Sequence, residues 1–159
     1  MKMKEQELPL SYKIPLLIMG ITFIVWMSHF DCKKENEINK VGLEDLNLKL
    51  TGVVVSVDYG DNFNGCGIIR LRVINSNIQE YDPRGKLKYY FCVIKKGMAE
   101  IYTGVPPPFY NIIGDTMIFD TRAKMGGYLK NGEKANYGSI SIYNHDSYYE
   151  YIQKHTIFK

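Results

Sequence analysis

The stretch IPLLIMGITFIVWMSHF, from Ile14 to Phe30, contains no Asp, Glu, Lys or Arg. As an α-helix these seventeen residues would be about 25 Å long, because each residue adds about 1.5 Å. The hydrocarbon core of a bilayer is about 30 Å thick, so this length is at the lower end of what spans it. We therefore predict a membrane-spanning helix that anchors the rest of the chain.

Two other interpretations of this stretch fit the sequence less well. A buried core helix should carry polar residues at helical spacing, but only Thr22, Ser28 and His29 are polar here, and two of them stand at the far end. A cleaved secretory signal should end in small residues, whereas bulky side chains occupy Trp26 to Phe30. An uncleaved anchor is the preferred interpretation.

A lipoprotein signal is the remaining alternative, because Cys32 follows the apolar run almost directly. Such a signal carries small and apolar residues before its cysteine, and His29, Phe30 and Asp31 depart from that pattern. Lipidation at Cys32 therefore stays an alternative to the transmembrane anchor.

The orientation of the anchor is not set by the basic residues around it. Three lysines precede the run and three follow it closely, so the positive-inside rule is undecided: Lys2, Lys4 and Lys13 against Lys33, Lys34 and Lys40. A short head of thirteen residues and a long remainder are typical of a signal anchor that exports its C-terminal part. We expect the body of the protein to lie outside the cytoplasm, in the cell envelope of a bacterium.

Composition predicts one β-rich domain after the anchor. The chain has 13 Tyr and 14 Gly, which favour strands and turns, and its net charge of +3 is too mild to require a polyanionic partner. The expected organisation is a head at 1–13, the anchor at 14–30, a charged and partly helical linker at 31–45, and a single domain at 46–159.

Alternation with a period of two predicts most of the strands. Leu46 to Val57 alternates but changes phase at Thr51 and Gly52, which indicates a bulge or bend at Gly52 within one long strand. Residues 67–74 predict a second strand with Ile69, Leu71 and Val73 inward, and 88–95 a third that is apolar on both faces, as in a central strand. Lys96 and Gly97 predict a tight hairpin into residues 98–102.

The second half of the body is less regular. Residues 113–121 predict a turn and a strand with Met117 and Phe119 on one face, 122–137 a long loop, and 139–143 a strand with Ile140 and Ile142 inward. The spacing of Ser147 and Glu150 favours a short terminal helix. A turn at residues 59–65 and an extended connection through the prolines at 106–108 complete the pattern.

Six short strands with a long bent first strand resemble a small barrel of the oligonucleotide- and oligosaccharide-binding (OB) type, with a two-sheet sandwich as the alternative. The bent first strand, followed later by Gly114, Asp115 and Thr116 and an apolar strand, also resembles small uncharacterised bacterial β-domains that are membrane-anchored or lipoproteins. That resemblance covers about Leu46 to Tyr143 and implies no catalytic residue.

The residues that often carry catalysis or metal binding are few and scattered. Cys66, Cys92, His155 and the neighbours His145 and Asp146 belong to no local catalytic motif. Three His and three Cys without ligand spacing indicate no metal site, and nothing in the sequence indicates a cofactor. A small hydrolase is the less favoured hypothesis, and a non-catalytic protein the preferred one.

A binding face is easier to predict than an active site. If the strands at 67–74 and 88–95 pair, then Arg70, Arg72 and Tyr90 share one outward face with Lys88 beyond them. We predict these four residues as ligand-binding, with a glycan or an envelope protein as the partner. The alternatives are a merely solvated face and, if the body faces the cytoplasm, a single-stranded nucleic-acid-binding or regulatory module.

Overall fold

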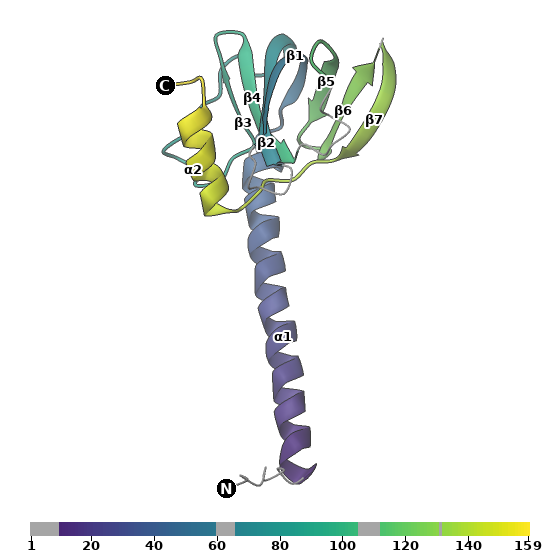
Figure 1. Cartoon of the computed structure of the whole chain (residues 1–159), viewed down its shortest axis with the longest axis vertical. Helices are drawn as coiled ribbons and strands as arrows, with labels where there is room; N and C mark the ends of the chain where they lie inside the picture. Colours follow the sequence, from purple (N-terminus) through teal and green to yellow (C-terminus); the bar gives the residue numbers. More distant parts are fainter. Residues whose placement is uncertain (1–9, 60–65, 105–111, 131) are drawn as a thin grey trace, which may run out of the picture. The chain divides into compact units, whose positions relative to one another are not determined.

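The computed structural model describes residues 10–59, 66–104, 112–130 and 132–159 (Figure 1). The turn expected at residues 59–65 and the proline-rich connection at 106–108 therefore fall almost wholly outside the described residues. The chain forms two compact units, Met1–Asn36 and Glu37–Lys159.

The first unit consists of helix α1 (Leu10–Asn39), whose last residues enter the second unit. Its apolar side chains are exposed: Leu17 is 65% and Met19 68% accessible. The hydroxyls of Thr22 and Ser28 donate to the carbonyls of Ile18 and Ile24 at 2.7 and 2.8 Å, so they need no partner outside the helix. By length and composition, this helix is suited to cross a membrane.

The second unit begins within the segment expected to be a solvated linker. A single π-helical stretch, η1 (Lys40–Glu44), follows α1 and buries Leu43 completely. The side-chain oxygen of Asn39 accepts a hydrogen bond from the Ile142 amide at 2.8 Å. The charged segment therefore contributes to the core from its middle onward, and its polar residues hid this in the sequence.

One antiparallel sheet forms the second unit, with strand order β3-β4-β2-β1-β5-β6-β7. The predicted β-rich class is confirmed, but the sheet is open, not closed as a barrel, and the two-sheet alternative is not found in the described residues. The strands are β1 (Lys49–Tyr59), β2 (Cys66–Ser76), β3 (Cys92–Lys95), β4 (Met98–Gly104), β5 (Thr116–Asp120), β6 (Met125–Lys130) and β7 (Glu133–Ser139).

The register of β1 and β2 shifts twice. The first shift lies between Thr51 and Gly52, as predicted, and leaves Ile74 of β2 without a partner in the ladder. The second lies between Val54 and Ser56 and leaves out Val55. Because inward residues are even-numbered up to Val54 and odd-numbered from Val57, the change of phase occurs at the second shift and not at Gly52.

The predicted pairing of the second and third strands is wrong. β4 lies between β2 and β3, so Arg72 is opposite Met98 and not near Tyr90. β3 is an edge strand and not a central one, although both of its faces are buried. The hairpin at Lys96 and Gly97, both with positive φ, is confirmed.

The segment expected to be a loop at 122–137 forms the hairpin of β6 and β7. Its glycines concealed the strand, because they provide no alternation of side chains. A Cβ atom at Gly126 would lie 2.8 Å from the Phe119 ring and from the Ile140 side chain, so these neighbours occupy the place of a side chain. Ile140 and Ile142 are buried as predicted, although no strand continues beyond Ser139.

Helix α2 (Asp146–His155) is confirmed, although the residue before it is His145 and no side chain caps it. It buries Tyr148, Tyr149 and Ile152 against the outer face of β2, β3 and β4 (Figure 1). The other face of the sheet carries the main core, which includes Leu50, Leu71 and Phe119. Because a helix covers the second face of β3, an edge strand reads as apolar on both sides.

Candidate functional site

The site is built where α2 crosses the segment that leads into β3. The Tyr90 amide donates to the Tyr149 hydroxyl at 2.8 Å, and that hydroxyl donates back to the Tyr90 carbonyl at 2.5 Å. The Tyr90 ring also packs edge-on against Tyr149 and Tyr102, with centroids 5.1 and 5.4 Å apart. Helix α2 and this segment are therefore held together by hydrogen bonds between the Tyr149 hydroxyl and the Tyr90 backbone, and by ring contacts.

An ion pair closes the turn at residues 82–85. The Arg84 guanidinium donates to both carboxylate oxygens of Asp82, at 2.7 and 2.5 Å, and to the Phe158 carbonyl. These bonds hold the pKa of the Asp82 carboxyl below its usual value and raise the pKa of Arg84. The pair thus fixes the turn to the segment that follows α2.

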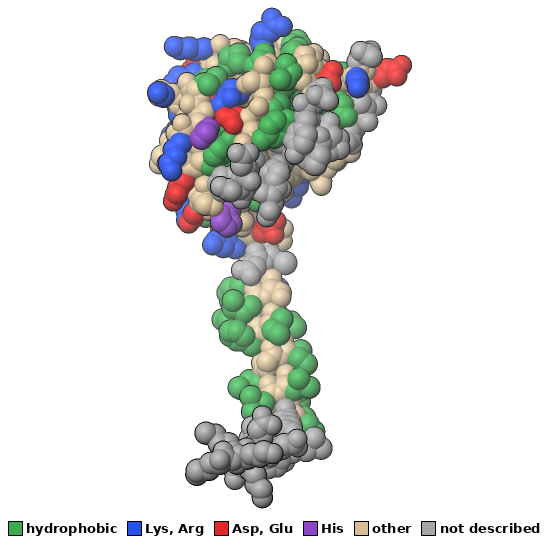
Figure 2. Space-filling model, in the orientation of Figure 1, with side chains coloured by type: hydrophobic (Ala, Val, Ile, Leu, Met, Phe, Trp, Pro, Cys, Tyr) green, Lys and Arg blue, Asp and Glu red, His purple; other side chains and the backbone are tan. Residues whose placement is uncertain are grey.

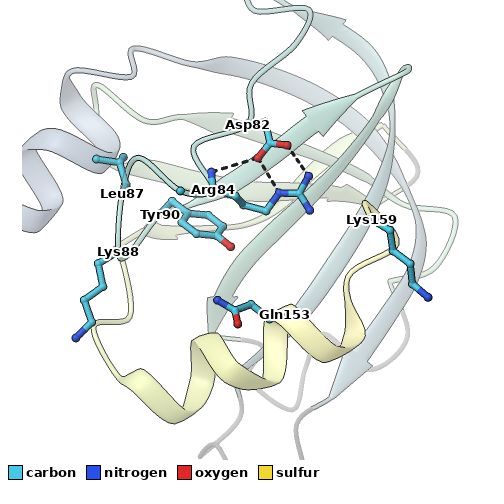
Figure 3. Close-up of a pocket in the computed structure, with 8 residues that line it drawn as sticks. Asp82, Arg84, Leu87, Lys88, Tyr90, Gln153 and Lys159 are labelled. Atoms are coloured by element: carbon cyan, nitrogen blue, oxygen red, sulfur yellow. Dashed lines mark hydrogen bonds and ion pairs between the residues drawn. The ribbon is translucent and has the colours of Figure 1, made fainter.

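Between the turn and α2 lies a groove of about 590 Å³. Its polar lining comes from two segments far apart in the chain, with Asp82, Arg84, Lys88 and Tyr90 in the first and Gln153 and Lys159 in the second. In Figure 3 the Tyr90 hydroxyl and the Gln153 amide point into the space between them, while Lys88 and Lys159 stand at opposite ends. The volume is within the range of small-molecule sites in proteins.

Tyr90 is the unusual member of this groove. Only 3% of the residue is accessible, yet its hydroxyl makes no hydrogen bond to any described residue. It is not sealed off, because no fully enclosed side-chain oxygen or nitrogen lacks a partner in the described part of the chain. The pKa of Tyr90 is raised, mainly by burial, so its hydroxyl stays protonated and can both donate and accept.

A second, smaller hollow of about 280 Å³ adjoins the first at Lys159. Lys95 and Lys96 of the β3–β4 hairpin line it together with the segment after α2, and no acidic side chain does. Lys and Arg side chains gather on this side of the unit, over α2 and the β3–β4 hairpin (Figure 2). The two hollows therefore combine neutral hydrogen-bonding groups with an uncompensated positive end.

A buried carboxylate lies under the end of α2. Glu100 is inaccessible and accepts from Arg70 Nε at 2.9 Å, Tyr102 at 3.0 Å, Thr156 at 2.5 Å and the Ile157 amide at 3.1 Å. A buried carboxylate with this many donors is satisfied and has no spare capacity for a ligand. Its contacts pin the segment after α2, and with it Lys159, to the sheet.

The structure divides the four predicted ligand-binding residues. Lys88 and Tyr90 both line the groove, but Arg70 is engaged by Glu100, and its guanidinium also donates to the His155 carbonyl at 2.7 Å. Arg72 is exposed on the same face of the sheet, opposite Met98. Ligand binding by these residues stays a prediction, now centred on Lys88 and Tyr90.

Among the described side chains, which do not include that of Cys66, the residues considered for catalysis do not converge. Cys92 is buried in the main core, where burial raises the pKa of its thiol. His145 contacts the Ser147 hydroxyl at 2.8 Å at the start of α2, and His155 lies 3.3 Å from Asp58 at its end. Within the described residues, no three His, Cys, Asp or Glu side chains are grouped to hold a metal ion.

Sequence reasoning missed Asp82, Arg84, Gln153 and Lys159. Nothing local in the sequence connects the turn at 82–85 with residues some seventy positions later. The available signal was the spacing of Tyr148, Tyr149 and Ile152, which predicts a helix with one apolar face. Such a helix must cover part of the sheet and so create a boundary at which a groove can form.

Comparisons with protein-family models, with curated proteins and with solved structures found no significant match. A fold alone would not define a function, because one fold carries many activities. The function must therefore be inferred from the side chains of α1 and of the groove.

Proposed function

We propose that this protein is a single-pass membrane protein whose β-unit is a non-catalytic binding domain, displayed outside the cytoplasm in the cell envelope and recognising a glycan or a protein partner. The observation that carries the proposal is the exposed apolar surface of α1 from Ile14 to Phe30. In Figure 2 green side chains project from both visible sides of this helix. Water solvates such a surface poorly, whereas lipid chains match it.

Aromatic side chains near one end of the apolar run support the same proposal. Phe23, Trp26 and Phe30 form a ladder, with successive ring centroids 6.2 and 4.6 Å apart. Amphipathic rings such as Trp are favoured at the interface between the hydrocarbon core and water. The ladder would place the C-terminal end of the run at one membrane surface, immediately before the charged residues from Lys33 onward.

The groove supports a binding role for the β-unit. It is preformed by the Asp82–Arg84 pair and the contacts of Tyr90, and it presents hydrogen-bonding groups without an assembled nucleophile, base or metal site among the described residues. A rigid, concave and polar surface of this kind suits recognition. A domain tethered to a membrane would hold this surface close to ligands of the envelope.

Fusions placed after Lys159 test the orientation. Alkaline phosphatase, which matures only outside the cytoplasm, should be active in the fusion, and green fluorescent protein exported by the same route should be dark. The reverse result would contradict the proposal and favour the cytoplasm-facing nucleic-acid-binding or regulatory module.

The mass of the membrane-bound protein distinguishes the two modes of attachment. An uncleaved anchor should give the intact mass of the 159-residue chain. A lipoprotein would have lost the residues before Cys32 and gained lipid, and Cys32→Ser would block both changes, so that variant would have the full unmodified mass. Intact mass together with an indifferent Cys32→Ser variant supports the transmembrane anchor.

A further inference from the structure

We infer that the groove beside α2 and the adjoining basic hollow together bind an acidic saccharide, with a neutral hydroxyl-bearing ring at Tyr90 and Gln153 and an anionic group at Lys159. This inference rests on the proposed binding function and names the class of its ligand. It is carried by two independent observations, one from each hollow.

The first observation is the unpartnered hydroxyl of Tyr90. The residue is 97% buried, since only 3% is accessible, and its hydroxyl points into the groove toward the amide of Gln153 (Figure 3). The hydroxyl oxygen itself is accessible from the groove, so a ligand hydroxyl can bond to it there in place of water. The phenol of Tyr90 and the carboxamide of Gln153 can each both donate and accept a hydrogen bond. Each hydroxyl of a sugar can do the same, so the two sets of groups match.

The second observation is the distribution of charge. Within the groove, Arg84 is matched by Asp82 and Lys88 by Asp146, so these cations are already paired. Lys159 makes no ion pair with a described residue, and the hollow that it shares with Lys95 and Lys96 has no acidic lining side chain. Even when the α-carboxylate of Lys159 is counted, the three lysine side chains leave this end positive, which favours a ligand with an anionic group at one end only.

A protein partner fits these observations less well. Protein interfaces are centred on apolar and aromatic side chains that are exposed before binding, and the tyrosines here are buried under α2. An acidic peptide would use the lysines but not the single buried hydroxyl. The contacts around Tyr90 favour a small hydroxylated ring.

The test uses the full chain in neutral detergent micelles at low ionic strength, with binding followed by NMR or calorimetry. The probes are 3′-sialyllactose, which has one carboxylate at one end and two neutral rings, its methyl ester, and triglutamate, so the saccharide and its charge vary separately. We expect the acid, 3′-sialyllactose, to bind several-fold more tightly than the ester and than triglutamate. Equal binding of triglutamate, or binding of none of the probes, would overturn the inference.

Variants separate the two halves of the site. Tyr90→Phe removes only the hydroxyl, and with Gln153→Ala it should weaken the acid and the ester alike, by about threefold to tenfold each. Lys159→Gln should weaken the acid and reduce its advantage over the ester, because Lys95 and Lys96 remain in the same hollow. Lys130→Gln on β6 removes a lysine that lines neither hollow and should change neither affinity by more than about twofold.

The outcomes distinguish this inference from the proposed function. If Tyr90→Phe binds the acid as tightly as the unchanged protein does, the groove is not the site and the inference is wrong. If no saccharide probe binds but the body is exported and membrane-anchored, the inference is wrong and the proposed function is not contradicted. A body retained in the cytoplasm would contradict the proposed function whatever the probes do.

Discussion

Gly52 shows how a single missing side chain sets the geometry of the sheet. A Cβ atom there would lie 2.9 Å from the Arg72 carbonyl oxygen and 3.0 Å from the Leu71 Cβ. The first of these neighbours is backbone, which cannot move aside without disturbing the β1–β2 pairing at the register shift. Glycine is therefore required at position 52 because β1 and β2 approach each other too closely there for a side chain.

We predict that Gly52→Ala lowers the free energy of unfolding by more than about 1 kcal/mol. Gly138→Ala on β7 is the matched control, because nothing lies within 4 Å of its added Cβ and its φ is not positive. The control should be neutral or slightly stabilising. Urea denaturation checks both, and equal effects would show that the close approach at Gly52 carries no cost.

Asp82 couples the turn at the groove to pH. Its carboxyl pKa is lowered in the folded protein, chiefly by the side-chain hydrogen bonds from Arg84. A lowered pKa stabilises the fold above the carboxyl pKa of the unfolded chain, about 4, and this contribution is lost as the pH falls through the folded value. The side chain is 35% accessible, so the contribution is at most about 1 kcal/mol.

We therefore predict that Asp82→Asn lowers stability at neutral pH and reduces the loss of stability on going to acid below about pH 4. Thermal melts at a series of pH values measure the difference from the unchanged protein. Glu80→Gln, which alters an exposed carboxylate two residues away, should leave the profile nearly unchanged. A profile for Asp82→Asn that is parallel to that of the unchanged protein would contradict the prediction.

At the scale of elements, the π-helical stretch η1 before β1 belongs to the folded unit. Leu43 in η1 is inaccessible, and Asn39 supplies the acceptor for the Ile142 amide. Removal of a buried leucine side chain typically costs about 2–5 kcal/mol. The boundary of the independent unit thus lies near Glu37, ahead of the first strand.

We predict that a fragment of residues 37–159 folds cooperatively, and that one of residues 46–159 is less stable by several kcal/mol or fails to fold. Circular dichroism with urea titration compares the two. Leu43→Ala in the longer fragment should reproduce much of the loss, whereas Val41→Ala, at a residue 44% accessible, should not. Equal midpoints for the two fragments would place residues 37–45 outside the fold.

For the whole molecule, the proposed attachment to the membrane would depend on the uncharged surface of α1. Ile21 and Ile24 are 53% and 65% accessible and lie on the middle of the apolar run. An arginine near the centre of a spanning helix costs about 2.5–3.5 kcal/mol in insertion. Two such changes would offset much of the favourable transfer of a run this short.

We predict that the double change Ile21→Arg and Ile24→Arg moves the protein from the carbonate-resistant membrane fraction to the soluble fraction. The double change to Leu at the same positions should leave it in the membrane. Retention of the arginine variant would indicate that attachment does not depend on this run, and a lipid anchor would then be the explanation to examine.

The sequence by itself determined the properties that depend on local composition and period. A run without charges identifies a helix suited to lipid, because transfer free energy sums over side chains irrespective of the rest of the fold. Alternation identified which residues of β2 and β5 face the core, including Leu71 and Phe119, because side chains on a strand alternate strictly between its two faces. The register shift beside Gly52 and helix α2 were likewise predicted from a local interruption and local spacing, although the change of phase that pointed to Gly52 lies at the second shift, after Val54.

Only the tertiary structure decided which elements are neighbours. β4 inserts between β2 and β3, and α2 covers the outer face there, so Tyr90 is buried at a groove instead of exposed beside Arg72. A strand that is apolar on both faces has the same sequence pattern whether it lies in the centre of a sheet or at an edge where a helix covers its outer face. Asp82, Tyr90, Gln153 and Lys159 share a site because hydrogen bonds across some sixty positions hold Tyr90 to Tyr149, and such long-range contacts leave no mark on the local pattern.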